Sequence, residues 1–342
     1  MTDEQWRIFL DVTDGKMVEP LPVGLIVDCP WLPGFSGMSV LDYLTDDRRW
    51  LAANLAAVER FPDVLFLPGF WAEYGMCTEP SAFGGRCVWP DDDFPFAKKM
   101  LHDYAEIDRL DKPNCRTDGM CPFVIKRLHR CREEIERSGH RIRFATSRGP
   151  MNIASYLMGH SEMLLGIKTD PEQIHKLLTV VTDFICEWLQ YQAVQFPSIE
   201  GMLVLDDLIG FVGGPDFQEF VVPYFKQIAE SIDVPVKALH NDCHGIATAR
   251  NMTAMGFNMF NFAFRHSLTE MRETCGEEVV LLGNIPPRDV LALGTAEDVR
   301  QSAAEALADF DDTRRLILSC GGGTPPGVSA ANIEALVAAA RG

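Results

Sequence analysis

The chain has 342 residues, of which 47% are hydrophobic and 23% charged, and these proportions exclude a disordered chain, a collagen and a coiled coil. Acidic residues outnumber basic residues by 49 to 31, which gives a net charge of -18 at pH 7. A surface this negative repels phosphate backbones and anionic lipids, so we expect no nucleic-acid partner and no membrane partner. The length suits either two domains or one α/β barrel.

The ten cysteines are dispersed along the chain, and none forms a CxxC pair. The N-terminal segment MTDEQWRIFLDVTDGKM opens acidic and lacks the apolar region of a signal peptide. No apolar run approaches the roughly 20 residues that a membrane-spanning helix needs. We therefore expect a cytoplasmic protein whose cysteines are thiols or metal ligands rather than disulfides.

Short apolar or β-branched runs alternate with amphipathic stretches along the chain, a pattern typical of βα units around a parallel sheet. Eight runs are predicted as strands, at residues 23–28, 64–67, 141–146, 202–205, 234–239, 259–262, 279–282 and 316–318. Helices are predicted at residues 46–60, 127–138, 153–158, 171–195, 215–231, 246–255, 268–274, 287–293, 296–310 and 332–340. Asp170 and Pro171 are a typical start for the longest of these helices.

Eight βα units in one chain predict a single domain over residues 1–342, folded as a (β/α)8 TIM barrel with its active-site cleft at the carboxyl ends of the strands. Residues 70–122 are rich in Gly, Pro, Asp, Cys and aromatic residues and lack clear periodicity, so we interpret them as a loop or insertion over the active site. The alternative is a doubly wound open sheet. That fold would normally show a GxGxxG turn after its first strand, whereas residues 29–34 read CPWLPG.

Polar residues at the predicted strand ends are the candidates for the site, because a barrel builds its active site there. Strand ends also favour turn-forming Asp and Asn, which explains part of the set without any function. The candidates for catalysis are Glu73, Asp206, Asp207 and His240. The candidates for substrate binding are Asp28, Arg148, Asn284, Gly321 and Gly322.

Metal-ligand residue types follow the strand at residues 234–239 in the sequence His240-Asn241-Asp242-Cys243. Cys320, at the end of the last strand, could join them if the fold brings the two strand ends together. The candidate metal ligands are therefore His240, Asp242, Cys243 and Cys320, with zinc as the expected ion. The alternative is a hydrogen-bonded strand-end histidine beside a small buried cysteine.

Two further features have a structural and a functional interpretation. Adjacent carboxylates on an extended segment point to opposite sides, so at most one of Asp206 and Asp207 faces the site and the other braces a loop. The run Gly321-Gly322-Gly323 would let backbone amides approach a ligand, or would simply form a flexible turn before the last helix. It does not match the GxxxxGK[ST] pattern of a nucleotide-binding loop.

Several ordered segments resemble the uroporphyrinogen decarboxylase superfamily, which includes uroporphyrinogen decarboxylase itself and zinc-dependent methyltransferases that act on methylcobamides, coenzyme M, tetrahydrofolate or methoxy-aromatic substrates. The similar segments are residues 149–159 (GPMNIASYLMG), 203–210 (LVLDDLIG), 217–228, 240–242, 282–289 (LGNIPPRD) with 294–295, and 317–327 (ILSCGGGTPPG). The resemblance covers residues 140–340 well and the N-terminal third loosely. It implies a distorted (β/α)8 barrel with a deep cleft, and relatives that are often dimers, so a homodimer is an assembly to expect.

The resemblance favours the methyltransferase branch. Uroporphyrinogen decarboxylases carry an Arg-Gln-Ala-Gly-Arg-Tyr segment after the first strand, where residues 29–35 here contain no arginine. The methyltransferases often have Glu-Ala-Glu-x-x-Gly after the second strand, and Glu73 matches the second Glu. Their zinc is commonly held by His-x-Cys and a later cysteine. His240 matches the histidine, but Asp242 and Gly322 stand at the two cysteine positions. Either the ligands have shifted, or His240 and Asp242 form an oxygen–nitrogen site, or no metal binds.

Three functions follow from these observations. The leading hypothesis is an enzyme that moves a methyl group between a small donor and a corrinoid, thiol or folate acceptor, with the corrinoid carried by a partner protein. The second is a decarboxylase without cofactor, in which Asp206 or Asp207 stabilises a protonated intermediate. The third is a small-molecule binding protein that kept the cleft but lost catalysis. Residues 70–122 are expected to determine the substrate.

Overall fold

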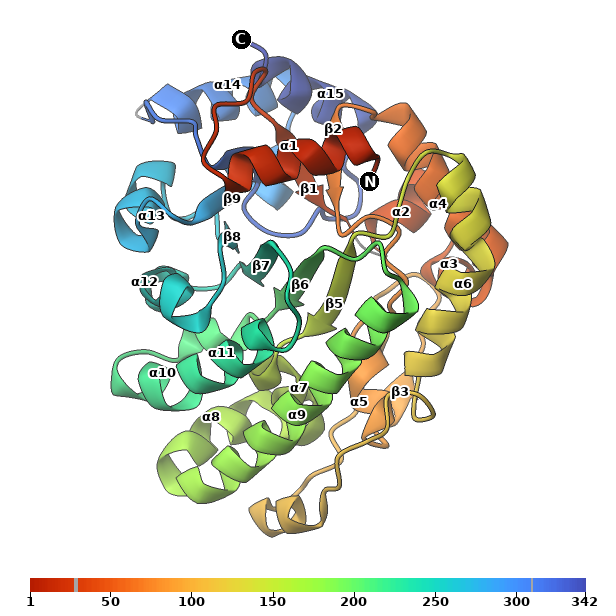
Figure 1. Cartoon of the computed structure of the whole chain (residues 1–342), viewed down its shortest axis with the longest axis vertical. Coiled ribbons are helices and arrows are strands. Elements are labelled where there is room, and N and C mark those ends of the chain that lie inside the picture. Colours follow the sequence, from red (N-terminus) through yellow and green to blue (C-terminus); the bar gives the residue numbers. More distant parts are fainter. Residues whose placement is uncertain (28–29, 309) are drawn as a thin grey trace.

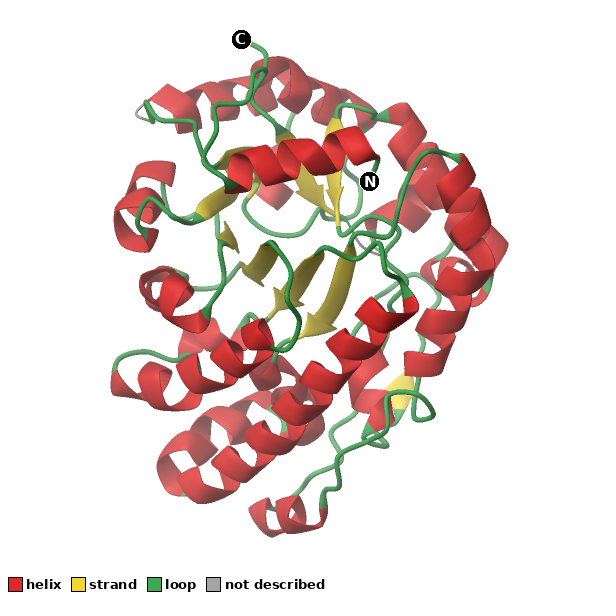
Figure 2. Ribbon diagram, in the orientation of Figure 1, coloured by secondary structure: helices red, strands yellow, loops and turns green. Residues whose placement is uncertain are grey.

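The computed structural model describes residues 1–27, 30–308 and 310–342. Asp28, one of the predicted substrate-binding residues, and Cys29 lie outside the described residues. Eight parallel strands form one curled sheet in the order β2-β1-β10-β9-β8-β7-β6-β5, with helices around its outside (Figures 1 and 2). The strands are β1 (Val23–Ile26), β2 (Val64–Leu67), β5 (Phe144–Arg148), β6 (Gly201–Leu205), β7 (Val236–Asn241), β8 (Met259–Phe262), β9 (Val280–Ile285) and β10 (Leu316–Cys320). The predicted distorted (β/α)8 barrel is confirmed, and each predicted strand overlaps one of these eight.

The helices follow the predicted pattern with local differences. The longer ones are α1 (Asp3–Thr13), α4 (Asp47–Arg60), α6 (Cys121–Arg137), α7 (Pro150–Met158), α8 (His160–Thr169), α9 (Pro171–Gln195), α11 (Val222–Glu230), α12 (Ile246–Met255), α13 (Leu268–Cys275), α14 (Ala296–Ala308) and α15 (Ala330–Ala339). The shorter ones are α2 (Trp31–Phe35), α3 (Val40–Thr45), α5 (Thr78–Ala82), α10 (Pro215–Phe220), η1 (Tyr104–Arg109), η2 (Leu208–Phe211) and η3 (Pro287–Ala292). No helix among the described residues is long and apolar enough to cross a membrane.

Three differences from prediction have local causes. Helices α1 and α8 were not predicted; α1 begins at a capping box in which Thr2 and Gln5 bond each other's backbone N–H groups. The helix predicted at residues 215–231 is broken at Val221, just before a proline at the start of α11. Residues 70–122 are not one irregular loop, since they hold α5, η1, the start of α6, and a small antiparallel pair formed by β3 (Cys87–Val88) and β4 (Phe96–Ala97).

Side chains on the two faces of the sheet enter two separate apolar clusters. Alternate residues such as Leu316, Leu318 and Cys320 of β10 pack outward in the large cluster between sheet and helices. The residue between the first two, Ile317, packs in the smaller cluster inside the barrel. The inner cluster also contains Trp6 and Phe9 of α1 with alternate residues of other strands, so α1 fills the amino-terminal end of the barrel.

The sheet is open between its two outermost strands, because no ladder joins β2 to β5 among the described residues. Other contacts close this seam at both ends. At the amino-terminal end, Met1 exchanges backbone hydrogen bonds with Arg141, and the Gln5 side chain donates to Val64 O. At the carboxyl end, Arg148 of β5 forms a buried ion pair with Glu73, which follows β2. Two of the predicted site residues, Glu73 and Arg148, therefore join β2 to β5 at the carboxyl end of this opening.

Candidate functional site

The alternation of β6 separates the two adjacent aspartates that follow it. Leu203 and Leu205 belong to the inner cluster, so the alternation directs Asp207 inward and Asp206 outward. Asp206 is fully buried, and its Oδ2 accepts hydrogen bonds from the N–H groups of Met151 at 2.8 Å and Asn152 at 3.1 Å. Asp206 thus braces the start of α7, and Asp207 faces the site. One residue in each role is what the sequence predicted for these two aspartates.

Burial raises the pKa of Asp206 to about 8, although the hydrogen bonds from the backbone of α7 act in the opposite direction. Its second oxygen, Oδ1, is buried without a hydrogen-bond partner. The turn before α7 fits closely around this carboxyl group, because a Cβ on Gly149 would lie only 2.4 Å from Asp206 Oδ2. Burial therefore favours the protonated form of the Asp206 carboxyl group.

Asp206→Asn is expected to flatten the pH dependence of stability. The folded state keeps the Asp206 proton up to a pKa of about 8, whereas the ordinary value is 3.8. The resulting stability is fully present below about pH 4 and falls as pH rises towards 8, by at most roughly 1.4 kcal/mol per pH unit. Asparagine does not titrate and can still accept from α7, so urea unfolding should show a smaller pH slope. An unchanged slope would contradict this assignment.

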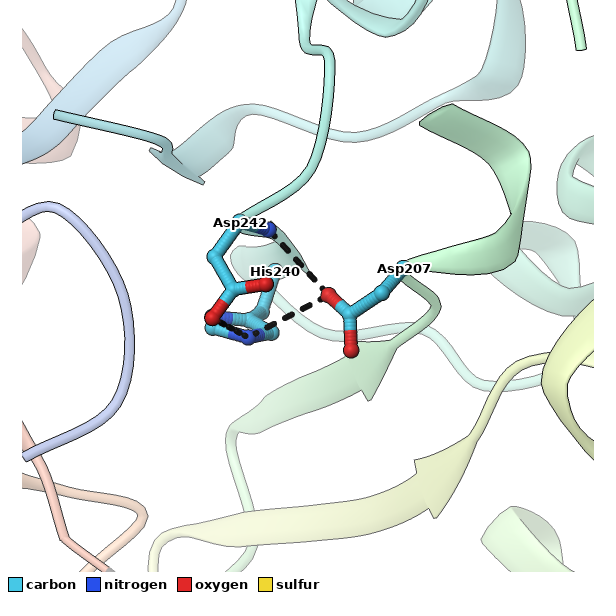
Figure 3. A group of neighbouring side chains, drawn as sticks. All are labelled: Asp207, His240 and Asp242. Atoms are coloured by element: carbon cyan, nitrogen blue, oxygen red, sulfur yellow. Dashed lines mark hydrogen bonds and ion pairs between the residues drawn. The ribbon is translucent and has the colours of Figure 1, made fainter. Parts of the chain in front are cut away.

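Asp207, His240 and Asp242 come together at the carboxyl ends of β6 and β7 (Figure 3). His240 Nε2 lies 3.5 Å from Asp207 Oδ1 and 3.9 Å from Asp242 Oδ2. The backbone N–H of Asp242 donates to Asp207 Oδ1 at 3.1 Å. One ligand atom from each side chain lies within 4.8 Å of the others. We call these three residues the carboxylate–imidazole group.

The other ring nitrogen of His240 is held by Asn261 of β8. Asn261 Nδ2 donates to the carbonyl oxygens of Leu282 at 2.7 Å and Cys320 at 3.1 Å, which turns its Oδ1 towards His240. His240 Nδ1 therefore donates to Asn261 Oδ1 at 2.7 Å. In neutral His240 the proton is on Nδ1, and the lone pair of Nε2 faces the two carboxylates.

The two acids of this group lie close enough to repel each other. Burial raises the pKa of Asp242, the nearby Asp207 carboxylate raises it further, and His240 acts in the opposite direction. Among the described residues, the ion pairs of Asp207 and Asp242 all involve His240. Such a concentration of acceptor atoms is relieved by binding a cation.

The structure does not bring the sulfur atoms of Cys243 and Cys320 into the carboxylate–imidazole group. Cys320 is fully buried on the outer face of β10, and its thiol donates to Gly322 O at 3.2 Å. Cys243 lies in the bend after β7, and its Cβ packs closely over Gly210. Burial raises the pKa of Cys243 to about 11 and that of Cys320 to about 12, which disfavours the thiolates that a metal needs.

Glu73 and Arg148 are in a second cluster, at the seam between β2 and β5. Arg148 Nη2 lies 2.5 Å from Glu73 Oε1, and the guanidinium group lies over the Trp71 ring. Glu79 of α5 accepts hydrogen bonds from Arg148 N at 3.0 Å and Ser147 Oγ at 3.2 Å. Burial raises the pKa of Glu79. Glu73, predicted as catalytic, and Arg148, predicted to bind substrate, thus hold each other across the seam.

The remaining predicted residues pack loops around the site. Asn284 is buried, and its Nδ2 donates to His266 O. A Cβ on Gly321 would lie 2.4 Å from Phe264 N, so glycine allows the loops after β8 and β10 to approach closely. A Cβ on Gly322 would lie 3.2 Å from Asp242 Oδ2, so this position faces the carboxylate–imidazole group.

Sequence reasoning missed Asn261 and Glu79. Asn261 had a usable signal, because it is the polar residue within an otherwise apolar predicted strand, at the inward parity of Met259. Glu79 had none, since it lies in the aperiodic segment that becomes α5.

A cavity of about 490 Å³ adjoins Asp207. It is bounded by α7, the segment after β6 and the region around β4, and its larger apolar side chains are Met76, Phe96, Tyr156, Leu208 and Phe211. Burial raises the pKa of Tyr156. A larger cavity of about 990 Å³ near α4 and α6 contains none of the predicted site residues. The cavity beside Asp207 can thus present a small molecule to the carboxylate–imidazole group.

A (β/α)8 barrel with polar side chains gathered at the carboxyl ends of its strands is characteristic of an enzyme. The family model described as uroporphyrinogen decarboxylase (URO-D) matches residues 7–342. The chain therefore belongs to the uroporphyrinogen decarboxylase family, an enzyme superfamily.

Curated relatives and a solved structure are similar to this chain over most of its length. The chain is 25% identical to the uroporphyrinogen decarboxylase of Dichelobacter nodosus over 354 residues, which cover 97% of this chain and 96% of the relative. It is also 25% identical to the enzyme of that name from Thioalkalivibrio sulfidiphilus, over 87% of this chain and 85% of the relative. A methyltransferase from Methanosarcina mazei has a similar structure, with a TM-score of 0.79, 20% identity, and coverage of 97% of this chain and 96% of that one. This last likeness shows the fold alone.

Proposed function

We propose that this protein is a methyltransferase of the uroporphyrinogen decarboxylase family, moving a methyl group between a small donor and a corrinoid, thiol or folate acceptor. The observation that carries the proposal is the carboxylate–imidazole group at the carboxyl ends of β6 and β7, beside a cavity that apolar side chains line together with Lys99, Asn152, Ser155 and His160. A corrinoid acceptor would arrive on a partner protein.

The charges around the site argue against a porphyrinogen with many carboxylates as substrate. Residues 29–35 contain no arginine, and the buried Arg148 is already paired with Glu73. Asp207 and Asp242 would repel a polyanion entering beside them. Decarboxylation remains the second candidate because curated relatives that align over nearly the whole chain carry the name uroporphyrinogen decarboxylase.

The family resemblance implies zinc. Whether a metal ion fits this chain depends on the oxygen and nitrogen atoms that the carboxylate–imidazole group offers. Asp207, His240 and Asp242 offer two oxygens and one nitrogen, which are ligands for a divalent cation. The position of Gly322 supports this fit, because a side chain there would be directed at Asp242. When bound, the cation would supply Lewis acidity that polarises the heteroatom carrying the methyl group.

The chain's own residues account for binding and orientation. Asn261 holds His240 so that Nε2 points into the group. The apolar side chains that line the cavity, including Phe96 and Phe211, would contact the donor beside Asp207. Asp207 would position the donor's polar end, since its carboxylate lines both the cavity and the group.

Parallel assays of the purified chain test this function. With methylcobalamin and a thiol or folate acceptor, we expect the absorbance change of corrinoid demethylation, and with uroporphyrinogen we expect no carbon dioxide. Carbon dioxide release that persists in chelator, without corrinoid turnover, would instead support the decarboxylase. Ligand-induced thermal stabilisation with neither reaction would support a binding protein.

A further inference from the structure

We infer that the carboxylate–imidazole group binds a divalent metal ion without any cysteine, through Asp207 Oδ1, His240 Nε2 and Asp242 Oδ2. This inference extends the proposed function by giving the ligand set of the same site, and its test does not depend on methyl transfer. It differs from the sequence-based ligand set of His240, Asp242, Cys243 and Cys320. The ion would be one that accepts oxygen and nitrogen donors, such as Mn²⁺, Co²⁺ or Zn²⁺.

The alternation of the strands places the oxygen donors inside the barrel and the sulfur atoms elsewhere. Val236 and Ala238 of β7 lie in the inner cluster, so His240 and Asp242 continue that face. Cys243 lies past the end of β7, and its Cβ packs against Gly210. Cys320 packs with the outward residues of β10.

Asp207 supplies an oxygen ligand and a negative charge in place of a missing thiolate. Its Oδ1 is already positioned by the backbone N–H of Asp242 at 3.1 Å, on the same side as His240 Nε2. Two carboxylates and one neutral imidazole neutralise a divalent cation, as two thiolates and an imidazole would. The exchange replaces soft sulfur ligands by hard oxygen ligands.

The orientation of His240 also points to a bound ligand. Its side chain is 6% exposed, and the Nδ1–H bond to Asn261 leaves Nε2 as the atom directed into the group. A histidine held in this tautomer by a partner on the other nitrogen is the usual arrangement for metal-binding imidazoles.

Gly322 leaves space on the open side of Asp242. Its φ is 144°, a conformation that side-chain-bearing residues rarely adopt, and a Cβ there would come within 3.2 Å of Asp242 Oδ2. The Asp242 side chain is 45% exposed, so water or a substrate heteroatom can reach the group from solvent. The proposed site therefore has three protein ligands and open positions, as catalytic metal sites do.

Cobalt(II) titration of the full-length protein tests the ligand set, because thiolate ligands give Co²⁺ an intense near-ultraviolet charge-transfer band and oxygen and nitrogen ligands do not. We expect wild-type protein to bind Co²⁺ with visible d–d bands and without the thiolate band. Asp242→Cys should introduce that band, since position 242 would then supply a sulfur ligand. Cys243→Ser and Cys320→Ser should leave the wild-type spectrum unchanged.

Asp207→Asn is the decisive affinity variant, because it keeps the shape of the side chain and removes its charge. We expect the dissociation constant for Co²⁺ to rise at least about tenfold, in the range typical of lost ligand charge. A thiolate band in wild-type protein that Cys243→Ser or Cys320→Ser removes would overturn the inference. So would unchanged affinity in Asp207→Asn, or no Co²⁺ binding in folded wild-type protein. Metal binding without methyl transfer would instead count against the proposed function alone.

Discussion

Replacing His240 with alanine is expected to abolish bound metal and to lower methyl-transfer activity by about 1,000-fold, because a Lewis acid contributes several kcal/mol and each 1.4 kcal/mol corresponds to about tenfold. His240 is the sole nitrogen donor of the carboxylate–imidazole group. Its removal also leaves Asp207 and Asp242 facing each other without the imidazole between them. Metal content after dialysis and the rate of corrinoid demethylation provide the two measurements.

His244→Ala is the matched control for this variant. His244 is exposed, lies four residues after His240, and has its ring 5.4 Å from the ring of His266 rather than in the group. It should keep both metal and activity. Asn261→Leu should fall between the two, with a loss of about 10–100-fold in metal affinity, because the orientation of His240 is no longer enforced. If His240→Ala retained metal and activity, the group would not be the catalytic site.

Much of the fold was predictable because parallel strands buried on both faces are short, continuous apolar runs. The segments VLFL at β2 and MFNF at β8 are examples, and each is fully buried. The opening between β2 and β5 was not predictable, since strand patterns do not reveal which neighbours pair. Helix α1 was missed because its role depends on a distant contact, the insertion of Trp6 and Phe9 into the end of the barrel.

The alternation of side chains along a strand predicts which residues of the candidate site face the inside of the barrel. Parity correctly separated Asp206 from Asp207, and the same rule applied to β10 would have placed Cys320 on the outer face with Leu316 and Leu318. The sequence motif suggested nearby cysteines as replacements for missing ligands, but closeness in sequence does not overcome the alternation of side chains. The approach of Asp207 to His240 depends on the register of β6 and β7, which pairs Leu205 with His240.

Arg148→Met is expected to destabilise the fold by about 3–5 kcal/mol, because it leaves buried carboxylates without their cation. Glu73 and Arg148 are each only 8% exposed at the side chain, and Arg148 also counteracts the raised pKa of the buried Glu79. Without Arg148, burial would raise the pKa of Glu79 further, so Glu79 would take up a proton on folding. The free energy of unfolding should therefore fall further as pH rises, and urea unfolding at several pH values measures this.

Two further variants separate the seam from ordinary ion-pair effects. Arg300→Met removes an exposed pair with Glu297 and should cost less than about 1 kcal/mol. The double variant Glu73→Leu with Arg148→Met should recover much of the loss, since apolar side chains of similar volume can replace a buried ion pair. A loss in Arg148→Met no larger than in Arg300→Met would mean that the contacts of α1 at the amino-terminal end suffice to close the sheet between β2 and β5.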